Sequence, residues 1–146
     1  MTPSAFEIVT LVCAALFSGA AAYITFVEHP ARVSAGANVA LAEFRPSYRR
    51  GTVMQASLAA LGFLSAVFAW LASHDVGILI PGVLLGSVIP FTLLVILPTN
   101  KRLLDPNLDA LSTEATSLLR RWGRLHAVRT IVSLAAFALL LVRFAR

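Results

Sequence analysis

The sequence has a single cysteine and few charged side chains, and both shortages limit what the chain can be. Charged residues make up 13% of the 146 residues and hydrophobic residues 58%, which is too apolar for an ordinary soluble domain. The one cysteine, Cys13, lies in an apolar stretch, so it excludes a disulfide within the chain and leaves the redox compartment open. No repeat, low-complexity tract or second domain is recognisable. We therefore treat residues 1–146 as one domain.

Four apolar stretches are long enough for a helix to cross the hydrocarbon core of a bilayer. They predict an all-α fold, a polytopic membrane four-helix bundle with two cytoplasmic basic loops. The predicted helices cover about residues 6–29, 52–72, 76–98 and 113–143. The first should stop at Pro30 and the third near Pro98, because proline lacks the amide N–H and its ring hinders a helix. A short interfacial helix is predicted at residues 38–44, inside the first long loop.

Lys and Arg gather in the two long connections between the apolar stretches. The first connection holds Arg32, Arg45, Arg49 and Arg50, and the second holds Lys101, Arg102, Arg120, Arg121 and Arg124. The positive-inside rule then places both connections in the cytoplasm and both termini outside. Arg143 and Arg146 oppose this orientation, but nine basic residues outweigh two. The same placement indicates lipid headgroups, and not nucleic acid, as the partner of the basic residues.

Two local patterns in the apolar stretches allow specific readings. Small residues at 18–22 resemble a signal-peptide cleavage site, but the preceding segment has no Lys or Arg and carries Glu7. We therefore expect the first stretch to be a spanning helix. The spacing of Gly82 and Gly86 permits the close approach of a neighbouring helix.

The segment from Arg120 to Arg129 carries the clearest functional signal. Read as a helix, it puts Trp122, His126 and Arg129 on one face and Arg120 and Arg124 on the other. Ionisable side chains in a membrane helix are costly and usually face the bundle interior. Other polar residues reach the same depth: Thr25, Glu28 and His29 in the first helix, Gln55 in the second, and Thr99 and Asn100 in the third. The sequence thus predicts one polar layer at the cytoplasmic ends of the helices.

This layer contains the groups needed to form and hold an organic anion. His29 and His126 can act as general bases near neutral pH. Arg129 and Asn100 can hold a developing oxyanion such as a phenolate or enolate. A flat ring can stack on aromatic side chains from two of the helices. The predicted substrate contacts are Thr25, Phe26, Glu28, Gln55 and Trp122.

Other readings of the same residues remain open. Glu28, His29 and His126 make up a two-His-one-carboxylate set that can bind a metal ion, and a haem held by the two histidines is a further alternative. Glu28 can instead form an ion pair with Arg129, and His29 a hydrogen bond with Asn100. Those two contacts would simply close the bundle.

Three ordered motifs resemble the anthrone oxygenase-like family, and the likeness covers nearly the whole chain. They are Phe26-Val27-Glu28-His29-Pro30, Pro98-Thr99-Asn100-Lys101-Arg102-Leu103, and Arg121-Trp122-Gly123-Arg124-Leu125-His126-Ala127-Val128-Arg129. The family consists of small four-helix membrane proteins, mostly of unknown function. Its fungal members oxidise anthrones to anthraquinones with molecular oxygen and are usually described without a bound cofactor. The resemblance implies oxidation of a lipophilic aromatic or quinol-like substrate, in an integral protein of the bacterial inner membrane.

Two functions are therefore carried forward. One is a membrane oxidoreductase or oxygenase whose pocket opens at the cytoplasmic leaflet. The other is a non-catalytic membrane protein that binds lipid or a small molecule, with the polar layer as a structural latch. The expected partners are the bilayer and a lipophilic small molecule, and a homo-oligomer is left open. A cavity lined by the polar layer favours the first function.

Overall fold

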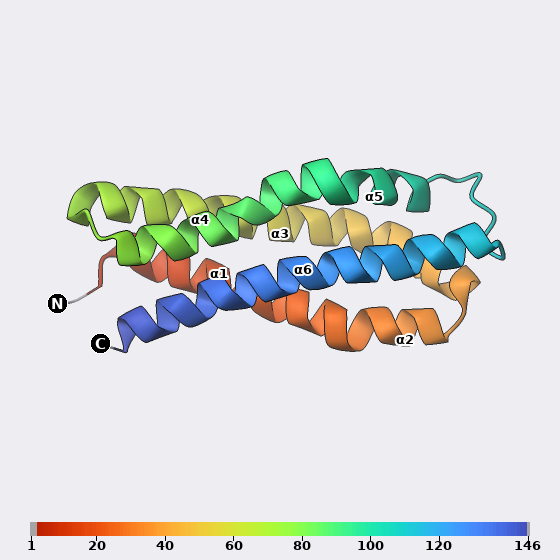
Figure 1. Ribbon diagram of the computed structural model, residues 1–146, viewed down its shortest axis with the longest axis horizontal. Coiled ribbons are helices and arrows are strands. Elements are labelled where there is room, and N and C mark those ends of the chain that lie inside the picture. Colours follow the sequence, from red (N-terminus) through yellow and green to blue (C-terminus); the bar gives the residue numbers. More distant parts are fainter. Residues whose placement is uncertain (1–2, 146) are drawn as a thin grey trace.

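Four long helical rods run side by side in the computed structural model, which describes residues 3–145 (Figure 1). Each rod is long and apolar enough to cross a membrane, so this is an integral membrane protein with the predicted all-α bundle. The rods consist of α1 (Ala5–Tyr23), η1 (Ile24–Glu28) and α2 (His29–Ser34); α3 (Ala37–Ser73); α4 (Val76–Phe91), η2 (Thr92–Ile96) and α5 (Leu97–Leu103); and α6 (Thr113–Phe144).

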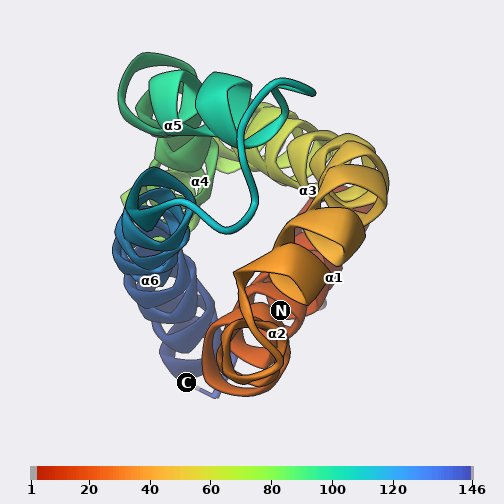
Figure 2. The same ribbon diagram turned by 90° about the vertical axis from the view of Figure 1, so that its right-hand side faces the viewer.

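The chain ends lie together at one end of the bundle (Figure 1). We call this the terminus end, and the opposite end, which carries α2 and α5, the polar end. Viewed along the axis, α3 and α6 lie diagonally across the bundle, each packed against the first and third rods (Figure 2). Successive rods are antiparallel, so α3 and α6 run in the same direction. This parallel pair forms two facing walls of the site described below.

The predicted ends of the first three helices are wrong, because the helices continue through their prolines. The first rod passes Pro30 and ends at Ser34, and the third passes Pro98 and ends at Leu103. The predicted loop with a short helix at 38–44 is instead part of α3, which continues through Pro46. The basic residues at 45, 49 and 50 therefore lie on a helix, as do those at 101, 102, 120, 121 and 124, and not in the predicted basic loops.

Two wide helical turns explain how the rods pass Pro30 and Pro98. A proline ring collides with the carbonyl four residues earlier in an α-helix. In both rods a π-helical turn ends two residues before the proline. Its backbone hydrogen bonds reach back five residues and not four, as from the His29 N–H to the Ile24 carbonyl. A π turn is wider than an α turn and can accommodate the ring. The chain then reverses at Gly36, whose φ of +95° suits glycine.

An ion cluster closes the terminus end. Arg143 on α6 bonds to Glu7 on α1 and, at 2.9 Å from its Nε, to Asp75 in the turn before α4. The pKa of Asp75 lies below its ordinary value, because its carboxylate accepts hydrogen bonds. The Gly77 amide has the larger effect and Arg143 the smaller one. Arg146, which entered the charge comparison, lies outside the described residues.

Candidate functional site

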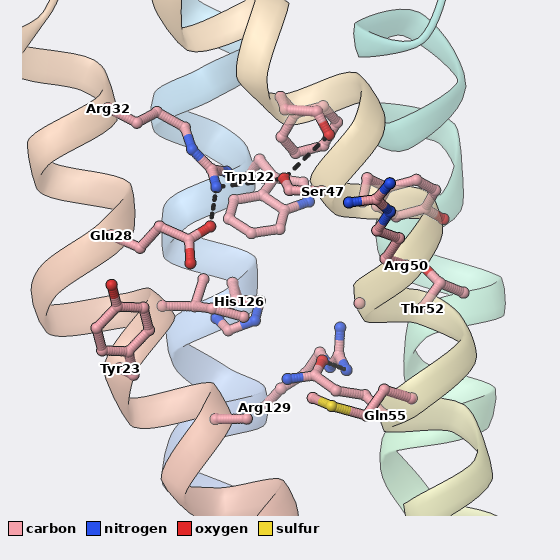
Figure 3. Close-up of a pocket in the computed structure, with 16 residues that line it drawn as sticks. Tyr23, Glu28, Arg32, Ser47, Arg50, Thr52, Gln55, Trp122, His126 and Arg129 are labelled. Carbon is pink, nitrogen blue, oxygen red and sulfur yellow. Dashed lines mark hydrogen bonds and ion pairs between the residues drawn. The ribbon is translucent and has the colours of Figure 1, made fainter.

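A cavity of about 310 Å³ lies near the polar end, between the first rod, α3 and α6. Figure 3 shows side chains from these three rods converging on it. Half-exposed residues such as Tyr23 and Met54 belong to its lining, so it opens on the outer surface between α1 and α3. Its polar lining residues are Tyr23, Glu28, Arg32, Ser47, Tyr48, Arg50, Thr52, Gln55, Trp122, His126 and Arg129.

One face of α6 forms a wall of the cavity, as its spacing predicts. Trp122, His126 and Arg129 follow one another along this face (Figure 3), while Arg120 and Arg124 are exposed on the other side. The rings of Trp122 and His126 stack with their centroids 4.7 Å apart. An uninterrupted α-helix repeats every 3.6 residues, so residues at i, i+4 and i+7 share a face. The sequence therefore located this wall correctly.

A chain of hydroxyl groups orients the ring of His126, which is 2% exposed. The Thr130 hydroxyl lies 3.2 Å from the carbonyls of Ala21 and of His126, to which it can only donate. Thr130 Oγ1 then accepts from Thr25 Oγ1 at 2.7 Å, and Thr25 in turn accepts from His126 Nδ1 at 3.0 Å. This order puts the proton of a neutral His126 on Nδ1. Its Nε2, which bonds to no described residue, is left as a free base.

Arg129 is the second reactive group of the cavity. It donates to Gln55 Oε1 at 2.7 Å, and its guanidinium lies 5.5 Å from the centroid of the Phe17 ring. None of residues 3–145 supplies a carboxylate to it. The Nε of Arg129 and the Nε2 of Gln55 are both buried without an acceptor. A partly buried cation with spare buried donors and no carboxylate partner favours an anionic ligand.

The predicted pairing of Glu28 with Arg129 is wrong. Glu28 pairs with Arg32, one turn later on the same rod, and Arg32 also pairs with Glu43 of α3. Opposite charges at i and i+4 on a helix meet readily. The buried Arg32 thus joins the first rod to α3, and its pair with Glu28 lies above the cavity in Figure 3. Glu28 therefore lines the cavity, but its carboxylate is already paired with Arg32.

Four predicted site residues lie outside the cavity lining: Thr25, Phe26, His29 and Asn100. Phe26 is 71% exposed, so the predicted stacking on a substrate is wrong. Thr25 acts through His126, as described above. His29 and Asn100 are buried, and each contacts Trp122.

Trp122 contacts both histidines that were expected to meet. Its ring lies 5.0 Å from that of His29 and stacks 4.7 Å from that of His126, whereas no hydrogen bond joins the two histidines. Asn100 accepts from Trp122 Nε1 at 2.9 Å and does not bond to His29. Residues 3–145 contain no group of three side chains arranged to hold a metal ion, so the proposed set of Glu28, His29 and His126 is not assembled.

Sequence reasoning missed several cavity residues on the rods, among them Arg32, Ser47 and Tyr48. A signal existed for Tyr48, because it precedes Gln55 by seven residues and so shares its face in a continuous helix. The assumption that α3 begins after Gly51 hid this relationship. For Arg32, the signal was its i, i+4 spacing from Glu28.

Fold and site together define a small four-helix membrane protein with a mostly apolar cavity that carries a few polar groups and opens at its flank. A sequence model described as "Anthrone oxygenase" matches residues 44–139, a range that includes Gln55, Trp122, His126 and Arg129. The chain belongs to the anthrone oxygenase family. No curated protein and no solved structure matches it. Family membership indicates an oxygenase-like role.

Proposed function

We propose that the protein is a membrane oxygenase that oxidises a lipophilic aromatic or quinol-like substrate with molecular oxygen. The observation that carries this proposal is a histidine with a free Nε2 beside a partly buried cation that has no carboxylate partner among residues 3–145. His126 offers a free Nε2, and Arg129 with Gln55 offers unused donors one turn away. A base and an anion site in one apolar cavity suit a reaction that passes through a carbanion, enolate or phenolate.

In the proposed reaction, the substrate ring lies against Trp122. His126 Nε2 removes a proton from an activated C–H or O–H group, and the oxygen that gains negative charge accepts from Arg129 and Gln55. For an activated methylene, the anion then gives electrons to molecular oxygen, and a C–O bond forms. The O–O bond breaks as a ketone forms, and both methylene hydrogens leave with the second oxygen atom as water. One CH2 group and one O2 thus become one C=O group and one H2O.

The proposal predicts a large loss of oxidation in His126→Asn. The Asn side chain can still donate to Thr25 but has no base at the position of Nε2. Loss of a general base typically lowers the rate about 10²- to 10⁴-fold. The measurement is oxygen uptake and product formation with anthrone as the probe, in detergent-purified protein. His74→Asn, at the exposed terminus end, is the control. If His126→Asn oxidised anthrone at the wild-type rate, His126 would not be the base. If the wild-type protein bound anthrone without oxygen uptake, the non-catalytic alternative would be favoured.

We also propose that the polar end faces the cytoplasm of a bacterial inner membrane, with both termini outside. The support is the number of basic residues near that end of the bundle. In a Cys13→Ala background, a membrane-impermeant thiol reagent added to cells should label Ser73→Cys and spare Arg49→Cys. Both positions are exposed: Ser73 is the last residue of α3, and Arg49 lies in the first half of the helix, toward the polar end. Labelling of Arg49→Cys alone would reverse the orientation.

A further inference from the structure

Tyr48 lines the cavity on α3, and its contacts determine the direction of its hydrogen bond. Trp122 Nε1 can only donate, so the atom of Asn100 that faces it at 2.9 Å is the amide oxygen. The amide nitrogen of Asn100 therefore faces Tyr48, 3.0 Å from its hydroxyl oxygen. That nitrogen can only donate, so the Tyr48 oxygen accepts. Its own proton is left for another acceptor.

No described residue accepts the Tyr48 proton, although Tyr48 belongs to the cavity lining. Asn100 is 1% exposed, so water does not compete for the amide that fixes this order. The Asn100 amide thus acts as a positioning group that keeps the Tyr48 hydroxyl a donor.

The two walls of the cavity are in matching register. Tyr48 and Gln55 are seven residues apart on α3, as are Trp122 and Arg129 on the parallel α6. Asn100 links the first residue of each pair, and a direct hydrogen bond links the second. Seven residues of α-helix advance ~10.5 Å, so the helix positions that carry the two sets of donors stand about that far apart, with His126 between them.

We propose that Tyr48 is a second substrate-binding donor, which receives a neutral oxygen of the substrate while Arg129 and Gln55 receive the anionic one. This inference rests on the proposed function and specifies its substrate class as a flat aromatic compound with two oxygen functions on opposite edges. Para oxygens across one ring lie about 5 Å apart, and two hydrogen bonds of about 2.8 Å each extend this to the spacing of the donor sets.

The test compares two probes that differ in one methoxy group, which supplies the second oxygen: 1-naphthol and 4-methoxy-1-naphthol. Their dissociation constants are measured by calorimetry under argon, on the purified full-length protein. Tyr48→Phe should raise the dissociation constant of 4-methoxy-1-naphthol by about 3- to 10-fold, which corresponds to the loss of one neutral hydrogen bond. The dissociation constant of 1-naphthol should not change, and this would also show that the cavity is intact.

The control is Ser87→Ala, because it also removes one hydroxyl group but lies exposed on α4, outside the cavity lining. It should change neither affinity. The proposal is overturned if Tyr48→Phe affects both probes equally or neither. Arg129→Gln distinguishes a failure of this inference from a failure of the proposed function, since it should weaken the binding of both probes by removing the anion site. If it weakens the binding of neither probe, Arg129 does not form an anion site, whatever the result for Tyr48→Phe.

Discussion

Arg129→Gln is expected to abolish most of the oxidation while leaving the protein folded. Loss of one preorganised donor to a developing oxyanion typically lowers the rate about 10²- to 10³-fold. Removing half of a buried ion pair would also destabilise the fold, but Arg129 has no carboxylate partner among residues 3–145. The melting temperature should therefore stay level or rise. Oxygen uptake with anthrone and thermal unfolding in detergent check the two halves of this prediction.

Arg124→Gln is the matched control, since Arg124 is exposed on the opposite face of α6. It should change neither quantity, because exposed charges contribute little. Arg129→Lys tests what the guanidinium supplies, since lysine keeps the charge and loses the planar set of donors. Full activity in Arg129→Lys would mean that a point charge suffices. Equal tolerance of Gln at 124 and 129 would rule out a functional role for the polar face of α6.

Among substitutions of a glycine by alanine, Gly82→Ala is expected to cause the largest loss of stability. A Cβ at Gly82 would lie 2.2 Å from the Cβ of Ala66, so α3 and α4 would have to separate. Overpacking of this kind costs typically ~1–3 kcal/mol, which exceeds the ~1 kcal/mol that Ala gains over Gly in a helix. Thermal or denaturant unfolding in detergent measures the net loss.

The clash partner provides a rescue experiment. Ala66→Gly removes the methyl group that the new side chain strikes, so the double variant should recover part of the lost stability. Gly19→Ala is the control, because a Cβ there meets nothing within 4 Å. It should be neutral or stabilising. An unchanged melting temperature in Gly82→Ala would show that the two helices are not in close contact at this point.

The sequence predicted the features that depend on helical periodicity alone. The number of spans, the face of α6 with Trp122, His126 and Arg129, and the close approach permitted by Gly82 follow from spacing and side-chain size. Each of these lies in a helix whose local geometry is regular or whose contact needs only a small residue. They are confirmed by the structure.

The predictions that failed depend on choices made by the tertiary structure. Whether a proline ends a helix depends on how the surrounding turns adjust: a π turn precedes Pro30, whereas α3 continues through Pro46 as an α-helix. Which cation meets Glu28 depends on which side chains surround it, and Arg32 is nearer than Arg129. The role of Asn100 depends on Tyr48 and Trp122, which lie 52 and 22 residues away along the chain. Spacing within one helix carries no information on such partners.

The two π turns also limit how deeply the molecule can sit in a bilayer. The proline after each turn offers no N–H to the carbonyl four residues earlier, at Phe26 and at Leu94. These residues are 71% and 78% exposed, on the outside of the bundle. A carbonyl left without a partner at this point would need water or headgroups, because hydrocarbon cannot satisfy it. The hydrocarbon layer is therefore expected to end at the level of these turns.

Helix lengths agree with this boundary. Twenty residues separate Phe6 from Phe26, which is ~30 Å of helix and the usual thickness of the hydrocarbon core. The same twenty residues counted back from Arg143 reach Gly123, so Trp122 is at the boundary and Arg129 lies beneath it. The cavity thus straddles the surface of the hydrocarbon layer. A flat amphiphile resting at that surface can slide between α1 and α3 to His126 without first dissolving in water.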